Sequence, residues 1–410
     1  MKEPLISVEE ALRRVLASAR VASGEETIAL SEACGRTLVR DIYALRTQPP
    51  FANSAMDGYA LIAADAEKPD TMLKLIGESA AGRAFSGRVN PGETVRIFTS
   101  APLPEGADAI AVQEDATREG DEVTFAAPVA AGDNVRHAGI DFSEAELLLR
   151  AGRRLTPRDI ALAAAANHAR LPCARKPRVA ILATGDELVA PGQKIGPSQI
   201  VASNNFFILG LVQALGGIGL DLGIARDDPK ALAQAIARAA GESADVLVTL
   251  GGASVGDYDL VQAALVEAGM DLGFWKIAMR PGKPLMHGRI GALRVLGLPG
   301  NPTSSAICGL LFLAPLIRAL LGDPEAGADR TEPARLGSAL RKNGPRQDYV
   351  RATLARADDG AWIATALPDQ DSSLVKVLAL ADALIIRSIG AEAAEAGAPC
   401  RILRIEALSR

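Results

Sequence analysis

The feature that constrains the fold most is a regular alternation of strand-like and helix-like segments between residues 178 and 317. Short apolar runs predict buried strands, and longer segments with apolar residues at helical spacing predict helices. In chain order the segments are strand 178–184, helix 205–216, strand 219–225, helix 229–240, strand 244–250, helix 257–269, strand 292–298 and helix 301–317. This alternation predicts a three-layer α/β domain, in which helices cover both faces of a parallel-rich sheet.

Short strand-like segments flank this region on both sides. Residues 47–142 are rich in Gly, Pro and alternating apolar residues, which is typical of a small β domain. After a linker-like segment at 322–334, short alternating runs return and predict a C-terminal β-barrel or sandwich. Two further helices are predicted, one opened by a capping box of Ser7 and Glu10 and one, rich in alanine, capped by Thr156.

Composition excludes several classes of protein. A chain of 410 residues is expected to hold about two to four domains. The net charge of −5 and the lack of any Lys/Arg-rich block argue against a general nucleic-acid surface. The four cysteines form no CxxC pair and the three histidines are scattered, so a zinc site or disulfide framework is not expected and a reducing cytoplasm is the default. The N-terminus does not resemble a signal peptide, and the lipid-like stretch 308–322 looks too short to span a bilayer.

The four predicted strand ends carry acids and glycines. In an open α/β sheet, ligands bind outside the carboxyl ends of the strands. The sequences at these ends are "ATGDEL", "ARDDP", "LGGASVGDYD" and "LPGNPTSS". The segment "WKIAMRPGKPL" adds the cations Lys276, Arg280 and Lys283. Carboxylates suit Mg²⁺, which bridges to substrate phosphates, and glycine-backed helix starts suit phosphate anions.

Each of these residues also has a purely structural explanation. Asp227 or Asp257 alone is more often a helix N-cap than a ligand, and Gly251 with Gly252 most often marks a tight turn. Their joint occurrence at consecutive strand ends is what favours a Mg²⁺-assisted site for a phosphate-bearing ligand. The residues alone do not identify that ligand.

Three familiar sites are disfavoured. Gly282-Lys283 is followed by Pro284, so it is not a Walker A loop. No GxGxxG follows a strand, which argues against a dinucleotide dehydrogenase. Ser254 lacks the GxSxG frame of a serine hydrolase.

The motifs together resemble a known family. The segments "NSAMDGYA", "RIFTSAPLPEGADAI", "ATGDEL", "GGASVGDYD", "RPGKPL" and "LPGNPTSS" occur in this order over nearly the whole chain. They are similar to those of the molybdopterin molybdenumtransferases, the MoeA family, which is related to the gephyrin E domain and to plant molybdenum insertases. The resemblance implies an elongated subunit of four parts. These are a discontinuous helical linker part (1–45 and 142–175), an inserted β domain (46–141), an α/β molybdopterin-binding domain (176–325) and a C-terminal β-barrel-like domain (326–410).

The resemblance also implies a reaction and its partners. A MoeA-type enzyme is expected to insert molybdate into adenylylated molybdopterin and to release AMP, with Mg²⁺ as cofactor. The expected setting is a cytoplasmic homodimer, with transient contacts to the adenylylating enzyme and to molybdoenzyme chaperones, and with no nucleic acid or membrane partner. The alternative is a scaffold of the gephyrin E-domain type that binds molybdopterin without catalysis. Retention of Asp57, Glu187, Asp227 and Asp257 argues against that alternative.

The family's functional residues carry over one at a time. Residues matched to catalysis are Asp57, Thr99, Asp141, Glu187, Asp227 and Asp257, of which the last three are also candidate metal ligands. Residues matched to binding of the pterin substrate are Gly251, Gly252, Ser254, Lys276, Pro299 and Pro302. Residues matched to a molybdate pocket are Arg280, Lys283, Ser304, Arg351 and Ser372.

Three positions depart from the family pattern. Arg280 stands where Lys is usual, so a guanidinium fork replaces a point charge. Ala202 replaces a common Asp or Asn, which weakens a nucleotide contact expected there. Asp371 stands where Gly is usual and adds negative charge beside the expected oxyanion pocket, where Ser372 and Ser373 are both available.

Overall fold

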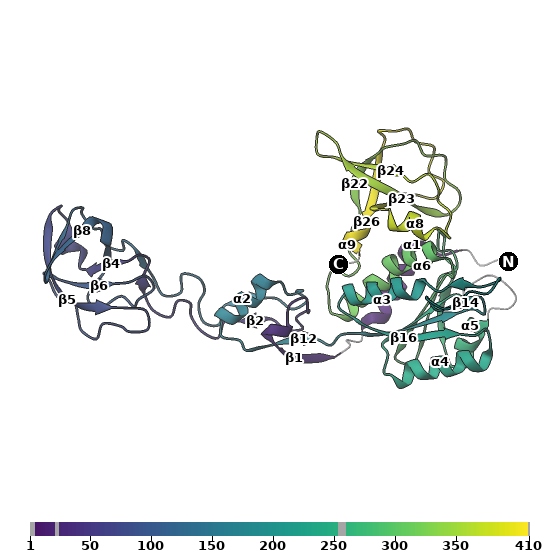
Figure 1. Cartoon of the computed structure of the whole chain (residues 1–410), viewed down its shortest axis with the longest axis horizontal. Helices are drawn as coiled ribbons and strands as arrows, with labels where there is room; N and C mark the ends of the chain where they lie inside the picture. The colour runs from purple at the N-terminus through teal and green to yellow at the C-terminus, as the bar shows by residue number, and fades with distance from the viewer. Residues whose placement is uncertain (1–4, 21–23, 253–259, 409–410) are drawn as a thin grey trace.

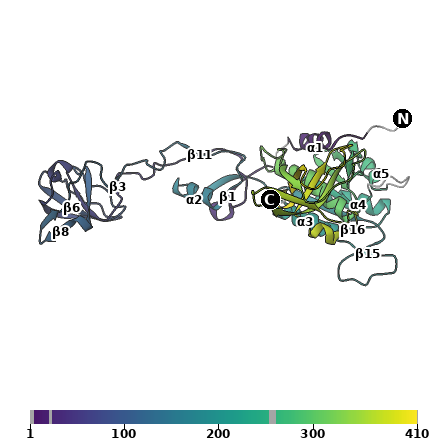
Figure 2. The same ribbon diagram turned by 90° about the horizontal axis from the view of Figure 1, so that it is seen from above.

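The structure, a computed structural model, describes residues 5–20, 24–252 and 260–408. The subunit is elongated (Figure 1). A small β domain forms one end, and the α/β domain with the C-terminal β domain forms the other. Between them lies a smaller part that contains α2 (Pro157–Ala165) and the antiparallel pair β1 (Glu25–Ala29) and β12 (Arg170–Ala174). The view from above in Figure 2 shows the same separation.

The α/β domain is built on a six-stranded sheet of order β16-β13-β17-β21-β20-β18. The first four strands are parallel, and the last two are antiparallel, which confirms the predicted parallel-rich sheet. Their bounds are β16 Ile218–Ala225, β13 Arg178–Thr184, β17 Val246–Leu250, β21 Leu293–Leu298, β20 Met286–Ile290 and β18 Asp271–Trp275.

Helices cover both faces of this sheet. Side chains alternate between the faces of a strand, so Val179 and Ile181 of β13 pack on one side, and Ala180 and Leu182 on the other. The first core contains residues of α3 (Asn204–Ala214), α6 (Pro302–Cys308) and α7 (Ala314–Leu320). The second contains residues of α4 (Pro229–Gly241) and α5 (Leu260–Glu267). The three-layer arrangement therefore follows from the near-continuous apolar strands.

The apolar helix at Pro302–Leu320 is longer than the apolar stretch noted in the sequence. α6 and α7 are joined through a π-helical turn, η5 (Gly309–Leu313), into 19 residues that are long and apolar enough to cross a membrane. The stretch 308–322 that the sequence singled out thus belongs to a helix that begins earlier, at Pro302. Of its most apolar window, 94% is buried inside the protein, where it forms the centre of the first α/β core.

The first helix joins the same core. α1 (Val8–Ala17) is capped by Ser7, whose Oγ accepts from the backbone N–H of Glu10, as predicted. Its buried residues Ala11 and Val15 pack with α7 rather than with the part around α2. That part has its own core, which includes Leu38, Leu155 and Leu171.

The two β domains differ in how their sheets close. The inserted domain has a sheet of order β7-β4-β6-β5-β9-β8. Its strands are β4 Gly58–Leu61, β5 Thr71–Ser79, β6 Glu93–Ile97, β7 Ala109–Val112, β8 Ala116–Glu119 and β9 Glu122–Phe125. In the C-terminal domain the order β23-β24-β22-β26-β25 closes through an additional β23–β25 pairing into a barrel. These strands are β22 Glu332–Leu336, β23 Gln347–Arg356, β24 Trp362–Ala366, β25 Ala383–Arg387 and β26 Pro399–Arg404.

A two-residue strand connects the barrel to the α/β domain. β19 (Met279–Arg280) comes from the α/β region but pairs in parallel with the start of β23, so that Arg280 lies opposite Asp348. This pairing joins the two domains, as do Tyr349, Leu384 and Leu403 of the barrel, which pack in the first α/β core.

Candidate functional site

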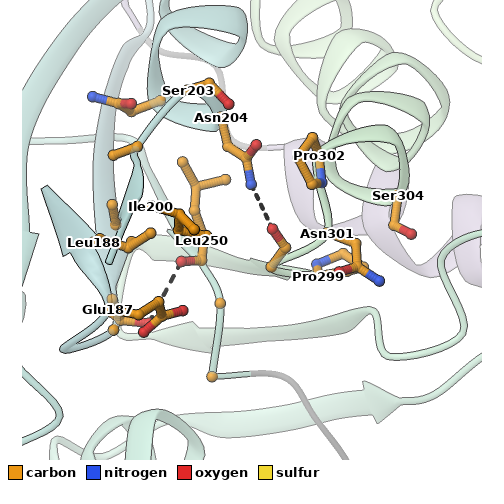
Figure 3. Close-up of a pocket in the computed structure, with 18 of the residues that line it drawn as sticks. Glu187, Leu188, Ile200, Ser203, Asn204, Leu250, Pro299, Asn301, Pro302 and Ser304 are labelled. Carbon is orange, nitrogen blue, oxygen red and sulfur yellow. Dashed lines mark hydrogen bonds between the residues drawn. The ribbon is translucent and has the colours of Figure 1, made fainter. Parts of the chain in front are cut away.

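A pocket of about 820 Å³ lies at the carboxyl ends of the parallel strands (Figure 3). Residues at or just after the ends of β13, β17 and β21 line it, together with the start of α3 and the start of α6. Of the predicted site residues, those that line it are Glu187, Asp227, Gly251, Gly252, Pro299, Pro302 and Ser304. The structure therefore brings together the predicted strand ends at one edge of the sheet, as the topology requires.

The glycines of the third strand end are required by the backbone. Gly251 and Gly252 have φ angles of 103° and 64°, which side chains other than Gly rarely adopt. A Cβ on Gly251 would lie 2.9 Å from the carbonyl oxygen of Thr184, and one on Gly252 would overlap the side chain of Val261. These residues keep the pocket floor free of side chains, so a ligand can approach the backbone closely.

The charge of the pocket is negative. Glu187 and Asp227 line it, and among the residues described there no lysine or arginine does. Burial raises the pKa of the Asp227 carboxyl, and repulsion from Asp186 and Glu187 raises it further. Asp186 and Glu187 are thus close enough to oppose the ionisation of Asp227, and a bound cation would relieve this repulsion.

The described residues do not complete a metal site by themselves. Within the ranges that the structure describes, no group of three or more His, Cys, Asp or Glu side chains is arranged to hold a metal ion. Two predicted site residues, Asp257 and Ser254, lie outside the described residues. Oxygen-rich acids of this kind fit Mg²⁺, which keeps several waters and takes further ligands from substrate phosphates.

The rim near α6 is tied to the C-terminal domain. The Nδ2 of Asn301 donates to the Oγ of Ser372 at 2.9 Å, and the backbone N–H of Thr303 donates to the Ser372 carbonyl at 3.0 Å. The neighbouring Ser373 lines the pocket, while its Oγ donates to Asp371 at 2.6 Å. Both serines therefore lie at the pocket rim, in different roles. Ser372 links the rim to Asn301 and Thr303 of the α/β domain, whereas the hydroxyl of Ser373 is hydrogen-bonded to the carboxylate of Asp371.

The predicted cations do not line this pocket. Arg351 is 1% exposed, and its guanidinium donates to Gln370 Oε1 and to the Asp371 carbonyl at 3.1 and 3.0 Å. Arg280 forms an ion pair with Asp348, and it lines a different cavity. The Nζ of Lys276 lies 3.6 Å from the ring centroid of Trp275, on a backbone with φ of 72°. Lys283 directly precedes Pro284, a lining residue.

The candidates on the inserted domain form a separate group. Both the backbone N–H and the Oγ1 of Thr99 donate to Asp57 Oδ1 at 2.7 Å, and these bonds lower the pKa of Asp57. Asp57 directly precedes β4, and Thr99 lies two residues after the end of β6. Both strands belong to the domain at the far end of the subunit. Asp141 lies between β10 (Val135–Arg136) and β11 (Leu147–Leu149). Within one chain, the structure does not bring these three residues to the α/β pocket.

Sequence reasoning missed part of the lining. Asn204 donates from Nδ2 to the Gly300 carbonyl at 2.7 Å and so joins the start of α3 to the last strand end (Figure 3). Leu188, Ile200 and Val201 give the pocket an apolar wall, and Ile200 is 58% exposed. Asn301 lay inside a quoted motif and could have been included. The apolar lining residues could not be predicted from the sequence, because an isolated Leu or Ile near a strand end is normally interpreted as part of the hydrophobic core.

Three family matches cover most of the chain. Residues 6–167 match the MoeA N-terminal region (domain I and II), residues 180–319 match a probable molybdopterin binding domain, and residues 333–405 match the MoeA C-terminal region (domain IV). A molybdopterin molybdenumtransferase of Haemophilus influenzae is 35% identical over 322 residues, which are 78% of this chain and 79% of the relative. One of Bacillus subtilis is 34% identical over 414 residues, covering 98% of this chain and 95% of the relative.

Solved structures agree with these matches. A crystal structure of the MoeA protein from Pyrococcus horikoshii superposes with a TM-score of 0.85 at 31% identity, covering 98% of this chain and 99% of that one. A crystal structure of a molybdopterin biosynthesis MoeA protein from Pyrococcus horikoshii OT3 superposes with a TM-score of 0.80 at 26% identity, covering 97% of this chain and 99% of that one.

The fold, the pocket and these matches define an enzyme of molybdenum cofactor biosynthesis that takes molybdopterin as its substrate. The chain belongs to the MoeA family, whose relatives above are molybdopterin molybdenumtransferases. The resemblance read from the sequence motifs is confirmed, and the expectation of an enzyme is confirmed over that of a scaffold.

Proposed function

We propose that this enzyme inserts molybdate into adenylylated molybdopterin with Mg²⁺-dependent release of AMP. The observation that carries the proposal is the acidic pocket of about 820 Å³, with Glu187 and Asp227 in its wall. A pocket whose described lining offers carboxylates and no Lys or Arg side chain repels a bare phosphate, so a phosphate-bearing substrate is expected to enter with a divalent cation. In this reaction water hydrolyses the pyrophosphate bond, which releases AMP and leaves the phosphate on molybdopterin. The two dithiolene sulfurs replace two oxygens of molybdate, which leave as water with protons from the thiols and the solvent, and the oxidation state of molybdenum does not change.

The carboxylates of Glu187 and Asp227 would hold Mg²⁺, with Asp257 as a third ligand by resemblance. When bound, the ion would neutralise charge on the phosphates as the bond to AMP breaks. Gly251 and Gly252 let the phosphate-bearing part lie against the end of β17, and the apolar wall at Leu188 and Ile200 suits a heteroaromatic ring.

We place the molybdate site between the pocket and the C-terminal domain. Ser304 lines the pocket and is 5% exposed, and Ser372 is fixed to its rim through Asn301. The positive charge for the oxyanion would come from Lys283, Arg280 and Arg351. Lys283 directly precedes the lining residue Pro284, Arg280 lies in β19, and Arg351 lies in the paired strand β23.

We propose further that the working form is a cytoplasmic homodimer with shared active sites. Asp57 and Thr99 lie on the domain at the far end of the subunit, so they can act at an α/β pocket only if it belongs to a second copy. A two-fold dimer would make two equivalent sites, each built from both chains.

The first test is incubation of the purified protein with adenylylated molybdopterin, molybdate and Mg²⁺, with AMP release and retained molybdenum both measured. We expect both, and we expect neither after chelation of divalent ions. AMP release that is unaffected by chelation would contradict the role of Mg²⁺.

The second test is subunit mixing. Asp57→Asn and Asp227→Asn subunits are each expected to be inactive, yet in a mixed dimer one site carries both changes and the other carries neither. Random pairing makes half of the dimers mixed, so about a quarter of all sites should be intact. Activity no higher than that of either variant alone, with exchange shown by differently tagged chains, would refute the shared site.

A further inference from the structure

A second cavity opens at the mouth of the C-terminal barrel. It has a volume of about 330 Å³ and shares no described lining residue with the α/β pocket. Its wall is formed by the start of β23, the segment that follows β24, the loop 338–343 and the end of β25. The charged residues in that wall are Arg280, Arg341, Lys342, Asp348 and Arg387.

The charges of this cavity do not cancel. Asp348 is 7% exposed and is neutralised by its ion pair with Arg280. Lys342 pairs with Glu392 at 2.6 Å, but the two side chains are 64% and 76% exposed, and such pairs are weak. Arg341 and Arg387 have no carboxylate partner among the described residues, so about two positive charges are uncompensated in the wall.

The loops that carry these cations are held in place by hydrogen bonds from side chains to backbone carbonyls. The Nδ2 of Asn343 donates to the carbonyls of Arg346, Arg387 and Ser388 at 2.9, 3.0 and 2.8 Å. The Nη2 of Arg387 donates to the carbonyl of Arg341 at 3.2 Å and to that of Glu392. The wall is therefore built before any ligand arrives, which lowers the entropic cost of binding.

We propose that the barrel mouth is a second anion site, which binds a small tetrahedral dianion of the phosphate or sulfate class. Guanidinium groups bind such oxyanions through charge-assisted hydrogen bonds, and two uncompensated positive charges match one dianion. The volume lies at the lower end of the range for ligand pockets, so the ligand is a free oxyanion or a small phosphate monoester. This site shares Arg280 with the proposed molybdate site, but it shares no described lining residue with the α/β pocket, and its occupancy does not depend on the proposed reaction.

Calorimetric titration of the full-length protein with inorganic phosphate tests the site. Glycerol phosphate and sulfate serve as parallel arms, and chloride is the reference anion. Chelator is present throughout, so that the acidic α/β pocket offers no cation for phosphate. The test variant is Arg341→Gln with Lys342→Gln, because both residues are exposed and their loss leaves the loop-holding bonds of Asn343 and Arg387 in place.

Two control variants match this change. Arg335→Gln with Arg356→Gln removes the same charge from the same domain but outside the cavity. Lys283→Gln removes a cation of the proposed molybdate pocket. Thermal unfolding of every variant checks that it is folded.

We expect saturable binding of phosphate that weakens about tenfold in the Arg341/Lys342 variant and is unchanged in both controls. Tighter binding of glycerol phosphate than of phosphate would assign the site to a monoester, and the reverse would assign it to the free oxyanion. An equal loss in the Arg335/Arg356 control would show general attraction only, and a loss confined to Lys283→Gln would place the anion elsewhere. Either result, or the lack of saturable binding by the unaltered protein, would overturn the proposal.

Discussion

The α/β pocket and the cavity at the mouth of the C-terminal barrel carry opposite charge. The first has Glu187 and Asp227 in its wall, and the second has four cations and one buried carboxylate. This difference in charge implies two different ways of binding an anion. The acidic pocket can hold phosphate only through a divalent cation, whereas the cationic cavity can hold an oxyanion directly. The four predictions below test that division.

The largest effect is expected from Asp227→Asn. We expect AMP release to fall on the order of a hundredfold, because a metal-binding carboxylate is lost from the pocket. Asp228→Asn is the matched control, since Asp228 caps α4 and does not line the pocket, and Asn can replace Asp as a cap. Equal activity of the two variants in a turnover assay would remove Asp227 from the mechanism.

The second prediction concerns binding without turnover. AMP at about one hundred times its Kd should stabilise the protein by about 2.7 kcal/mol when Mg²⁺ is present. Without Mg²⁺ the same concentration should give almost no stabilisation, because the pocket then offers carboxylates alone. Denaturant unfolding with and without chelator measures this. An equal increase in the free energy of unfolding with and without Mg²⁺ would contradict this contrast between the two cavities, since the α/β pocket would then bind phosphate without a cation.

The third prediction separates a buried cation from an exposed one. Arg351→Met should lower the free energy of unfolding by about 2 kcal/mol, because it removes the hydrogen bonds that the buried guanidinium donates to Gln370 Oε1 and to the Asp371 carbonyl. Arg280→Lys, at a side chain that is 58% exposed, should change stability little. Urea unfolding compares the two variants. If Arg351→Met is as stable as the unaltered chain, Arg351 has no structural role and its position serves the oxyanion alone.

The smallest effect is a pH-dependent gain in stability. The pKa of Asp227 is raised in the fold, so its ionised form destabilises the folded chain. That penalty is absent below the unfolded pKa of the carboxyl and complete above its folded pKa. Asp227→Asn should therefore raise Tm slightly at neutral pH, and the gain should vanish as the pH falls through the folded pKa. A gain that persists in acid would assign the effect to packing.

The sequence predicted the features that depend on local patterns. The alternation in 178–317 defined the parallel sheet, and acids at consecutive strand ends indicated the pocket edge. It did not predict β18 and β20, whose segments are short and interrupted by Gly273 and Gly288. The amphipathic pattern of α1 identified a helix but not the surface it covers. Arg351 was matched to the molybdate pocket, but its burial was not predicted, because a lone arginine in a sequence carries no sign that it will be buried.

The pairing of β19 with β23 has a consequence for how the protein can be divided. A fragment that begins after residue 325 would contain every strand of the closed barrel but would lack Met279 and Arg280. The start of β23 would then present an unpaired edge, and the buried carboxylate of Asp348 would lose its partner. The C-terminal domain, although a closed barrel by topology, is therefore a poor candidate for expression alone, and a soluble fragment should carry the segment around 276–284 with it.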